Sequence, residues 1–113
     1  TPTTDSSRLK KVLKHTSGFL YYVSVAGVTG TKKPLISGVK KAISKIKKNT
    51  NLPVLVGFGI DSYQQIKNLN KVADGCVIGS AIIKIIEDSL NKKSDPKKIS
   101  GNIRRFLLKL KRE

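Results

Sequence analysis

The stretch LPVLVGFGI at residues 52–60 decides the fold class. Its apolar residues follow one another without the alternation of a half-exposed strand, and it runs into a glycine-rich turn. A short apolar run of this kind is typical of a strand buried on both faces of a parallel sheet. Two further runs have the same character, FLYYVSV at 19–25 and the shorter ADGCVIGS at 73–80. We therefore predict three parallel strands.

The segments around these strands are predicted to be helices, because their apolar residues recur at helical spacing with lysines between them. The predicted helices are one capped by Asp5 or Ser6, one over 36–46, one capped by Asp61–Ser62, one over 81–90 and one after Asp95–Pro96. Gly18 is expected to end the first of them. Helices and strands therefore alternate, which favours a parallel sheet with right-handed crossovers.

A part of a closed barrel fits this pattern better than an open sheet. Three parallel strands with helices on one side would leave sheet edges and apolar faces uncovered. The sequence opens with a helix, contains no methionine, and at 113 residues has about half the length of an ordinary (β/α)8 barrel. We expect an α/β fold, the last three βα units of a (β/α)8 TIM barrel, with residues 1–113 as one partial domain of a longer chain.

The net charge of +16 raises the question of a nucleic-acid partner. The lysines are dispersed over predicted helices, and the aromatic residues, only 5% of the chain, are not interleaved with them as base stacking requires. We expect solvated helix faces and no nucleic-acid role, with a basic RNA-binding module as an alternative. No apolar run is long enough to cross a membrane. The single cysteine, Cys76, excludes an internal disulfide and is expected to be structural.

All three predicted strands are followed by glycine-rich loops: AGVTG at 26–30, GFGI at 57–60 and GSA at 79–81. In a barrel these loops share the face that carries function. Glycine lets the backbone approach a ligand, and the start of a helix near Ala81 adds partial positive charge. The sequence therefore predicts a phosphate site without cationic side chains. Its expected contacts are Gly30, Gly59, Gly79 and Ser80.

Each glycine taken alone is more often a simple turn residue. Other phosphate-sugar barrel enzymes, isomerases or synthases, also remain open at this point, since a phosphate site does not specify a reaction.

Three motifs together carry a resemblance to one family. The last three strands and loops of the tryptophan synthase alpha subunit family resemble three stretches of this chain. These are Y-x-V-S-V-x-G-V-T-G at 21–30, P-V-x-V-G-F-G-I at 53–60 and A-D-G-x-V-I-G-S-A-I-I-K at 73–84. The likeness extends over nearly all of the chain. It implies cleavage of indoleglycerol phosphate to indole and glyceraldehyde 3-phosphate.

The resemblance also implies roles for individual residues. Gly30, Gly59, Gly79 and Ser80 match the family's phosphate contacts, Tyr21 matches a pocket residue, and Phe58 matches an aromatic that packs on the indole ring. From alternation alone, Tyr21 is equally expected in the core. Val25 stands where some members have arginine, and the loop 28–34 is expected to close over substrate.

The resemblance places the two catalytic carboxylates on early strands, upstream of this chain, so no catalytic residue is expected here. Asp61 is the one acidic residue expected at the level of the loops, and it is interpreted as a helix cap. No cofactor is expected in this chain. The implied partner is a beta subunit that carries pyridoxal phosphate, in an alpha2-beta2 tetramer, and the implied location is the cytoplasm, or the plastid stroma in an alga or plant.

Overall fold

A single parallel sheet forms the centre of the molecule. The structure is a computed structural model that describes residues 1–24, 36–57 and 59–111. Within these residues the strands β1 (Leu20–Val23), β2 (Val54–Gly57) and β3 (Gly75–Val77) pair in the order β1-β2-β3. Val23, Gly57 and Val77 are partners across the sheet, so all three strands end at the same edge. The three predicted strands are confirmed, each shorter than its apolar run.

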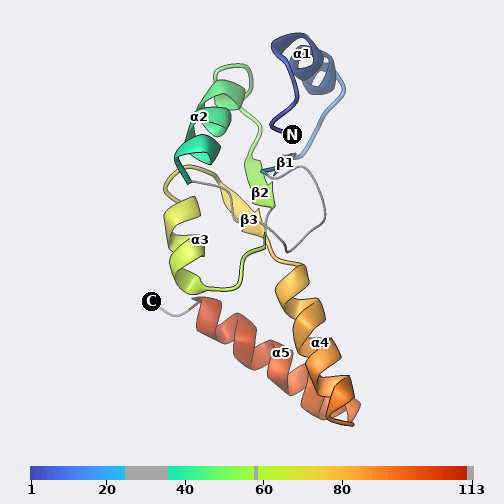
Figure 1. The fold of residues 1–113 in the computed structure, drawn as a ribbon. Helices are drawn as coiled ribbons and strands as arrows, with labels where there is room; N and C mark the ends of the chain where they lie inside the picture. Colours follow the sequence, from blue (N-terminus) through green and yellow to red (C-terminus); the bar gives the residue numbers. More distant parts are fainter. Residues whose placement is uncertain (25–35, 58, 112–113) are drawn as a thin grey trace.

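Helices stand at all the places where the sequence predicts them (Figure 1). They are α1 (Ser6–Lys14), α2 (Ile36–Lys47), α3 (Tyr63–Leu69), α4 (Ser80–Asn91) and α5 (Pro96–Lys111). Each strand is the neighbour of the next one in the chain. A doubly wound open sheet reverses its strand order at a switch point, whereas a barrel adds strands in sequence. The observed order is therefore that of a barrel segment.

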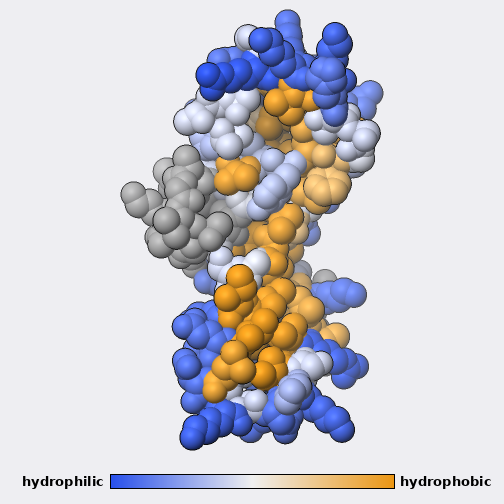
Figure 2. All heavy atoms as spheres, turned by 90° about the vertical axis from the view of Figure 1, so that its right-hand side faces the viewer, coloured by the Kyte–Doolittle hydropathy of each residue, from blue (hydrophilic) through white to orange (hydrophobic). Residues whose placement is uncertain are grey.

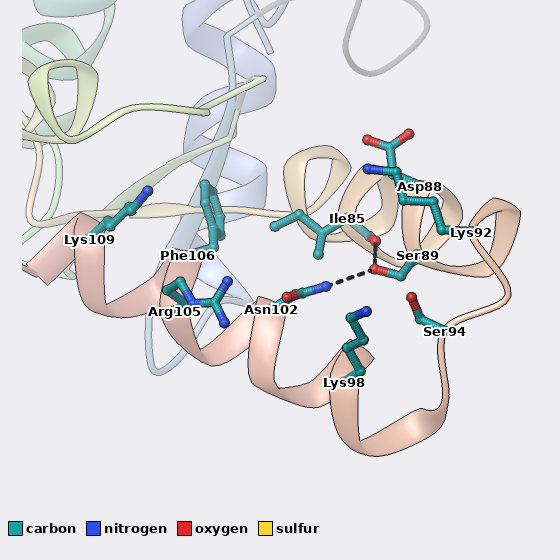
Figure 3. A pocket seen from close by; sticks show the side chains of 10 residues that line it. All are labelled: Ile85, Asp88, Ser89, Lys92, Ser94, Lys98, Asn102, Arg105, Phe106 and Lys109. Carbon is teal, nitrogen blue, oxygen red and sulfur yellow. Dashed lines mark hydrogen bonds between the residues drawn. The ribbon is translucent and has the colours of Figure 1, made fainter.

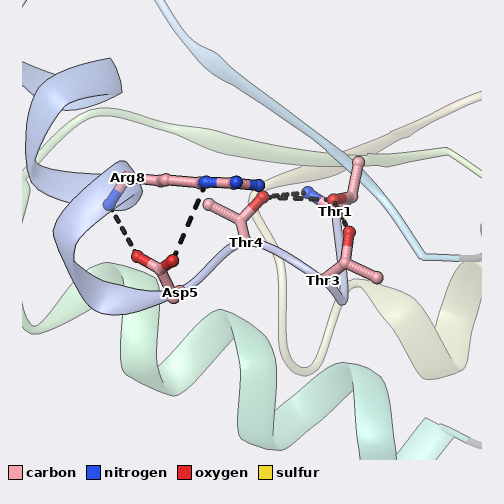
Figure 4. A network of polar contacts seen from close by, with 5 residues as sticks. All are labelled: Thr1, Thr3, Thr4, Asp5 and Arg8. Carbon is pink, nitrogen blue, oxygen red and sulfur yellow. Dashed lines mark hydrogen bonds and ion pairs between the residues drawn. The ribbon is translucent and has the colours of Figure 1, made fainter.

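The first helix begins as predicted and ends earlier. Asp5 accepts a hydrogen bond from the Arg8 N–H at 2.8 Å and forms an ion pair with its guanidinium, beside a cluster of threonine hydroxyls (Figure 4). At the other end, the Val12 carbonyl accepts bonds from the His15 N–H and the Thr16 hydroxyl. These bonds satisfy the last turn, so the helix ends at Lys14. Gly18 instead has φ of 79° in the turn before β1, and its prediction as the helix end was wrong.

The core lies between the sheet and the helices α2 and α3. Tyr22, Val56 and Cys76 are partners across the sheet, and all three pack in or against this core. The buried residues of the core come from β1, α2, β2, α3 and the segments flanking α3. They are Tyr22, Val39, Ile43, Val54, Val56, Ile60, Leu69 and Ala73. Burial also raises the pKa of the Cys76 thiol, which fits its predicted structural role.

The opposite face of the sheet is open, as expected of three parallel strands with helices on one side. Tyr21 is 52% exposed and Val77 39%. Figure 2 shows apolar side chains in a band along one side of the molecule, over the half that holds α4. The radius of gyration is 16.2 Å, against about 13 Å for a compact domain of this length. The helices α2 and α3 cover one face, and Tyr21 and Val77 are exposed on the other.

The helices α4 and α5 pack on each other, and α5 also contacts α3. Ser89 donates to the Ile85 carbonyl at 2.6 Å and accepts from the Asn102 amide at 3.2 Å, which links the two helices (Figure 3). A cleft of about 460 Å³ lies beside this link, with four cationic side chains on its walls, Lys92, Lys98, Arg105 and Lys109. It opens against the second half of α4 and therefore does not include Gly79 or Ser80.

Candidate functional site

The carboxyl edge of the sheet brings the predicted site residues into one region. Because Val23, Gly57 and Val77 are partners, the loops that follow the three strands start side by side. Gly59 lies two residues after the end of β2, and Gly79 lies two residues after the end of β3. In parallel α/β folds ligands bind at this edge.

Gly79 and Ser80 stand where β3 passes into α4. Gly79 is the N-cap of α4, and its carbonyl accepts from the N–H groups of Ile82 at 2.9 Å and Ile83 at 3.1 Å. Ser80 is the first helical residue, one of those whose N–H has no partner inside a helix. The first turn carries no acidic residue, so its partial positive charge is not neutralised there. A Cβ placed on Gly79 would meet no atom within 4 Å, so the space in front of this helix start is open.

Gly57 and Tyr21 meet on the open face of the sheet. Any Cβ on Gly57 would overlap the ring of Tyr21, so the ring lies directly over this glycine. Of the two alternatives for Tyr21, core or ligand-facing, the structure shows a half-exposed ring on the face opposite the helices. Beyond Gly57 the chain passes Gly59 and returns to the core at Ile60, which is 1% exposed.

Some of the predicted features lie outside the described residues. These are the site residues Gly30 and Phe58, the loop 28–34 that was expected to close over substrate, and Val25. The described part therefore brings together Tyr21, Gly59, Gly79 and Ser80 at one edge.

The acidic residues of the described chain are placed away from this edge, with one exception. Asp74 lies just before β3, at the opposite edge of the sheet. Glu87 and Asp88 lie on α4, and of the described acids only Asp61 lies in a loop after a strand. The Asp61 N–H donates to the Gln65 side-chain oxygen at 2.9 Å, just before α3. No group of three or more histidine, cysteine or acidic residues in the described ranges could hold a metal ion. Likewise, none of the described helices is long and apolar enough to cross a membrane.

Ser24 is a residue of this edge that the sequence analysis missed. It follows β1 directly, is 8% exposed, and donates to the Gly57 carbonyl through its hydroxyl at 3.1 Å and its N–H at 3.2 Å. The signal in the sequence was a single serine within the apolar run FLYYVSV. A buried hydroxyl needs a hydrogen-bond partner, and the end of the neighbouring strand was the nearest candidate.

Comparison with known proteins identifies the family. The model of the family described as "Tryptophan synthase alpha chain" matches residues 1–107. The chain belongs to the tryptophan synthase alpha chain family. The tryptophan synthase alpha chain of Zymomonas mobilis is 49% identical over 96 residues, which are 85% of this chain and 35% of that protein. That of Novosphingobium aromaticivorans is 48% identical over 86 residues, 76% of this chain and 32% of the relative.

Solved structures of tryptophan synthase alpha subunits have the same fold. The subunit from Campylobacter jejuni matches with a TM-score of 0.67 and 37% identity, over 90% of this chain and 39% of that one. The subunit from Legionella pneumophila matches with a TM-score of 0.69 and 31% identity, over 93% and 39%. The expected fold class, part of a (β/α)8 barrel, is confirmed. The chain spans about a third of the length of the curated tryptophan synthase alpha chains it matches.

Proposed function

We propose that residues 1–113 form the C-terminal part of a longer barrel domain that cleaves indoleglycerol phosphate to indole and glyceraldehyde 3-phosphate. Family membership supports the reaction. The share of each relative that is matched supports the partial domain. The observation that carries the role of this segment is the start of α4, where Gly79 and Ser80 face open space at the carboxyl edge of the sheet.

The segment is proposed to bind the substrate through its phosphate. The N–H groups at the start of α4 and the Ser80 hydroxyl supply donors to an anion, and the helix adds its partial positive charge. Gly30 and Gly59 are proposed to complete the site through their bare backbone. No lysine or arginine is needed, so the high net charge of the chain is not part of the site.

The indole end of the substrate is assigned to the open face of the sheet, opposite α2 and α3. Tyr21 lies on that face and is half exposed, and Phe58 is proposed to pack on the indole ring. Cleavage requires a proton delivered to the indole carbon that carries the glycerol chain, and a base for the glycerol hydroxyl. Asp61 is the one described acid in a loop after a strand, and its backbone is tied to Gln65 at the entrance to α3. As the resemblance to the family implies, we assign both catalytic carboxylates to strands upstream of this segment.

The indole product is proposed to pass to a beta subunit in an alpha2-beta2 tetramer. Family membership supports a beta-subunit partner. The pyridoxal phosphate that joins indole to serine would belong to that partner, and no cofactor is assigned to this chain. The proposed location is the cytoplasm, or the plastid stroma of an alga or plant.

The test is indole release from indoleglycerol phosphate. The isolated 113-residue chain is expected to release none, whereas the longest natural polypeptide that carries this sequence is expected to be active. Turnover by the isolated chain at a rate comparable to the longer protein would overturn the division of roles proposed here. A longer protein that binds glycerol phosphate without releasing indole would point to another phosphate-sugar enzyme.

A further inference from the structure

The bond between Ser24 and Gly57 joins the ends of two neighbouring strands at the carboxyl edge, where β1 and β2 lie side by side (Figure 1). Ser24 stands at the exit of β1, immediately before the loop that contains Gly30. Gly57 stands at the exit of β2, two residues before Gly59. The bond therefore connects the starting points of two of the three loops proposed to contact the phosphate.

The hydroxyl of Ser24 is a second donor to a carbonyl that already has one. The Ser24 N–H reaches the Gly57 oxygen at 3.2 Å as a continuation of the strand ladder, and the hydroxyl reaches the same oxygen at 3.1 Å. A carbonyl oxygen has two lone pairs, so two donors fix its direction where one leaves it free to pivot. The hydroxyl is therefore not needed to satisfy the Gly57 carbonyl, and its effect is to orient that carbonyl.

Orientation matters at this point because Gly57 has no side chain that packing could hold. Glycine is the residue whose backbone is least restricted, and the ring of Tyr21 occupies the space where a Cβ would lie. The Gly57 carbonyl belongs to the peptide unit that leads out of β2 towards Gly59. Fixing that oxygen fixes the plane of the peptide unit, and with it the direction in which the chain leaves the strand.

We propose that Ser24 is a positioning residue for the phosphate site: its hydroxyl holds the Gly57 peptide unit and thereby sets the place of the Gly59 backbone. This inference rests on the proposed function, since it assigns a purpose to the Gly59 loop. Ser24 acts through Gly57 and does not touch the substrate. The burial of Ser24 to 8% exposure keeps water from competing for the same carbonyl.

Ser89 offers a matched control. It is also a buried serine, 4% exposed, and its hydroxyl also donates to a carbonyl, that of Ile85 at 2.6 Å. The Ser89 hydroxyl also accepts from the Asn102 amide of α5, and both of its bonds lie away from the carboxyl edge. Removing the Ser24 hydroxyl deletes one hydrogen bond and removing the Ser89 hydroxyl deletes two, but only the Ser24 bond leads to the phosphate loop.

The experiment compares Ser24→Ala, Ser24→Thr and Ser89→Ala in the longest natural polypeptide that carries this sequence. Ser24→Ala should raise KM and the inhibition constant of glycerol phosphate by about threefold to tenfold, the ratio that corresponds to one ordinary hydrogen bond, with a smaller change in kcat. Ser24→Thr keeps a hydroxyl and should stay near the parent protein. Ser89→Ala should lower the melting temperature and leave both binding constants unchanged.

A second readout does not depend on the proposed reaction. Amide hydrogen exchange at Gly59, Ile60 and Asp61 should become faster in Ser24→Ala and stay unchanged in Ser89→Ala. If Ser24→Ala does not fold, Ser24→Cys replaces it, because a thiol has a similar volume and is a weak donor.

Two results would overturn the role of Ser24. In the first, Ser24→Ala lowers the melting temperature as Ser89→Ala does but leaves KM unchanged. In the second, amide hydrogen exchange at residues 59–61 is the same in Ser24→Ala as in the parent protein. If the parent protein does not bind glycerol phosphate, the proposed function fails, and the exchange comparison alone then decides whether Ser24 positions the loop.

Discussion

The two edges of the sheet are built differently. At the amino edge a charged side chain closes the structure: the Asp74 carboxylate accepts from the Val54 N–H and from the Lys47 ammonium, each at 2.8 Å, while the Asp74 N–H donates to the Val54 carbonyl at 3.0 Å. At the carboxyl edge the chain turns on glycines, and the start of α4 faces open space. The amino edge thus carries a charged side-chain clamp, and the carboxyl edge carries N–H groups at a helix start that have no partner inside the helix, as expected where ligands bind at the carboxyl edge.

The largest effect on ligand binding is expected from filling the open space at the carboxyl edge. Gly79→Val in the longer protein should weaken substrate and glycerol phosphate binding by about a hundredfold, because a side chain would displace the phosphate from the helix start. Ser80→Ala removes one hydrogen bond to a charged group and should have a smaller effect, about 1.5 kcal/mol or roughly tenfold. Steady-state kinetics with glycerol phosphate as competitor measures both. Unchanged KM and inhibition in Gly79→Val would show that the phosphate does not sit here.

Gly57 lies at the carboxyl edge, where it packs against the Tyr21 ring and precedes the proposed phosphate contact Gly59 by two residues. Gly57→Ala should move the Tyr21 ring, because a Cβ cannot share its space, at a stability cost of about 1–3 kcal/mol, the usual range for overpacking. Gly79→Ala is the control, since a Cβ there meets nothing within 4 Å. Denaturant unfolding of the two variants checks this. Equal stability of both variants would mean that Tyr21 turns away freely.

At the amino edge the expected effect falls on stability alone. Asp74→Ala leaves the N–H of Val54, a fully buried residue, without its carboxylate acceptor, and should cost about 1–3 kcal/mol. Asp74→Asn keeps an acceptor and should cost less. Asp88→Ala, which removes an exposed ion pair with Lys84, is the control and should be nearly neutral. A change in phosphate-ester binding in Asp74→Ala would contradict the separation of the two edges.

The same carboxylate gives the stability a pH dependence. The Lys47 ammonium, and after it the Val54 N–H, hold the pKa of Asp74 below its usual value. A lowered folded-state pKa contributes stability above the unfolded pKa and loses it as the pH falls through the folded one, so this contribution should be complete above about pH 4 and decline as the pH falls further. Because the side chain is 40% exposed, the effect should be modest. Comparing acid unfolding of the parent protein and Asp74→Asn isolates it.

The smallest effect is expected away from both edges. Lys93, after the end of α4, has φ of 52°, in the left-handed region that disfavours residues with a Cβ. Lys93→Gly should therefore stabilise the protein by about 1 kcal/mol and leave ligand binding unchanged. Thermal unfolding measures the gain. A loss of stability would mean that the lysine side chain contributes more than its backbone costs.

The sequence predicted the elements and their order because apolar spacing reflects local burial. The helices begin where Asp5 and Asp95 cap them, and both carboxylates accept the expected N–H bonds. Uncovered apolar faces were expected of three strands with helices on one side, but which face stays open was not predicted, because a continuous apolar run does not show which of its faces this chain covers itself. Asp74 and Ser24 were missed as clamps for a related reason. Their partners lie 20 and 33 residues away in the chain and become neighbours only when the strands pair.

The order of the strands has a consequence for how the chain folds. Every strand pairs with the one that follows it, so Leu20 meets Val54 and Leu55 meets Gly75, and no pairing waits for a distant part of the chain. Each pairing closes a loop of one βα unit, 34 residues from Leu20 to Val54 and 20 from Leu55 to Gly75, and pairing consecutive strands keeps these loops near the minimum that a parallel sheet allows. As the polypeptide leaves the ribosome, each new βα unit can therefore add to the growing edge in turn, and the helix that offers its start to the phosphate takes shape only after β3 has emerged.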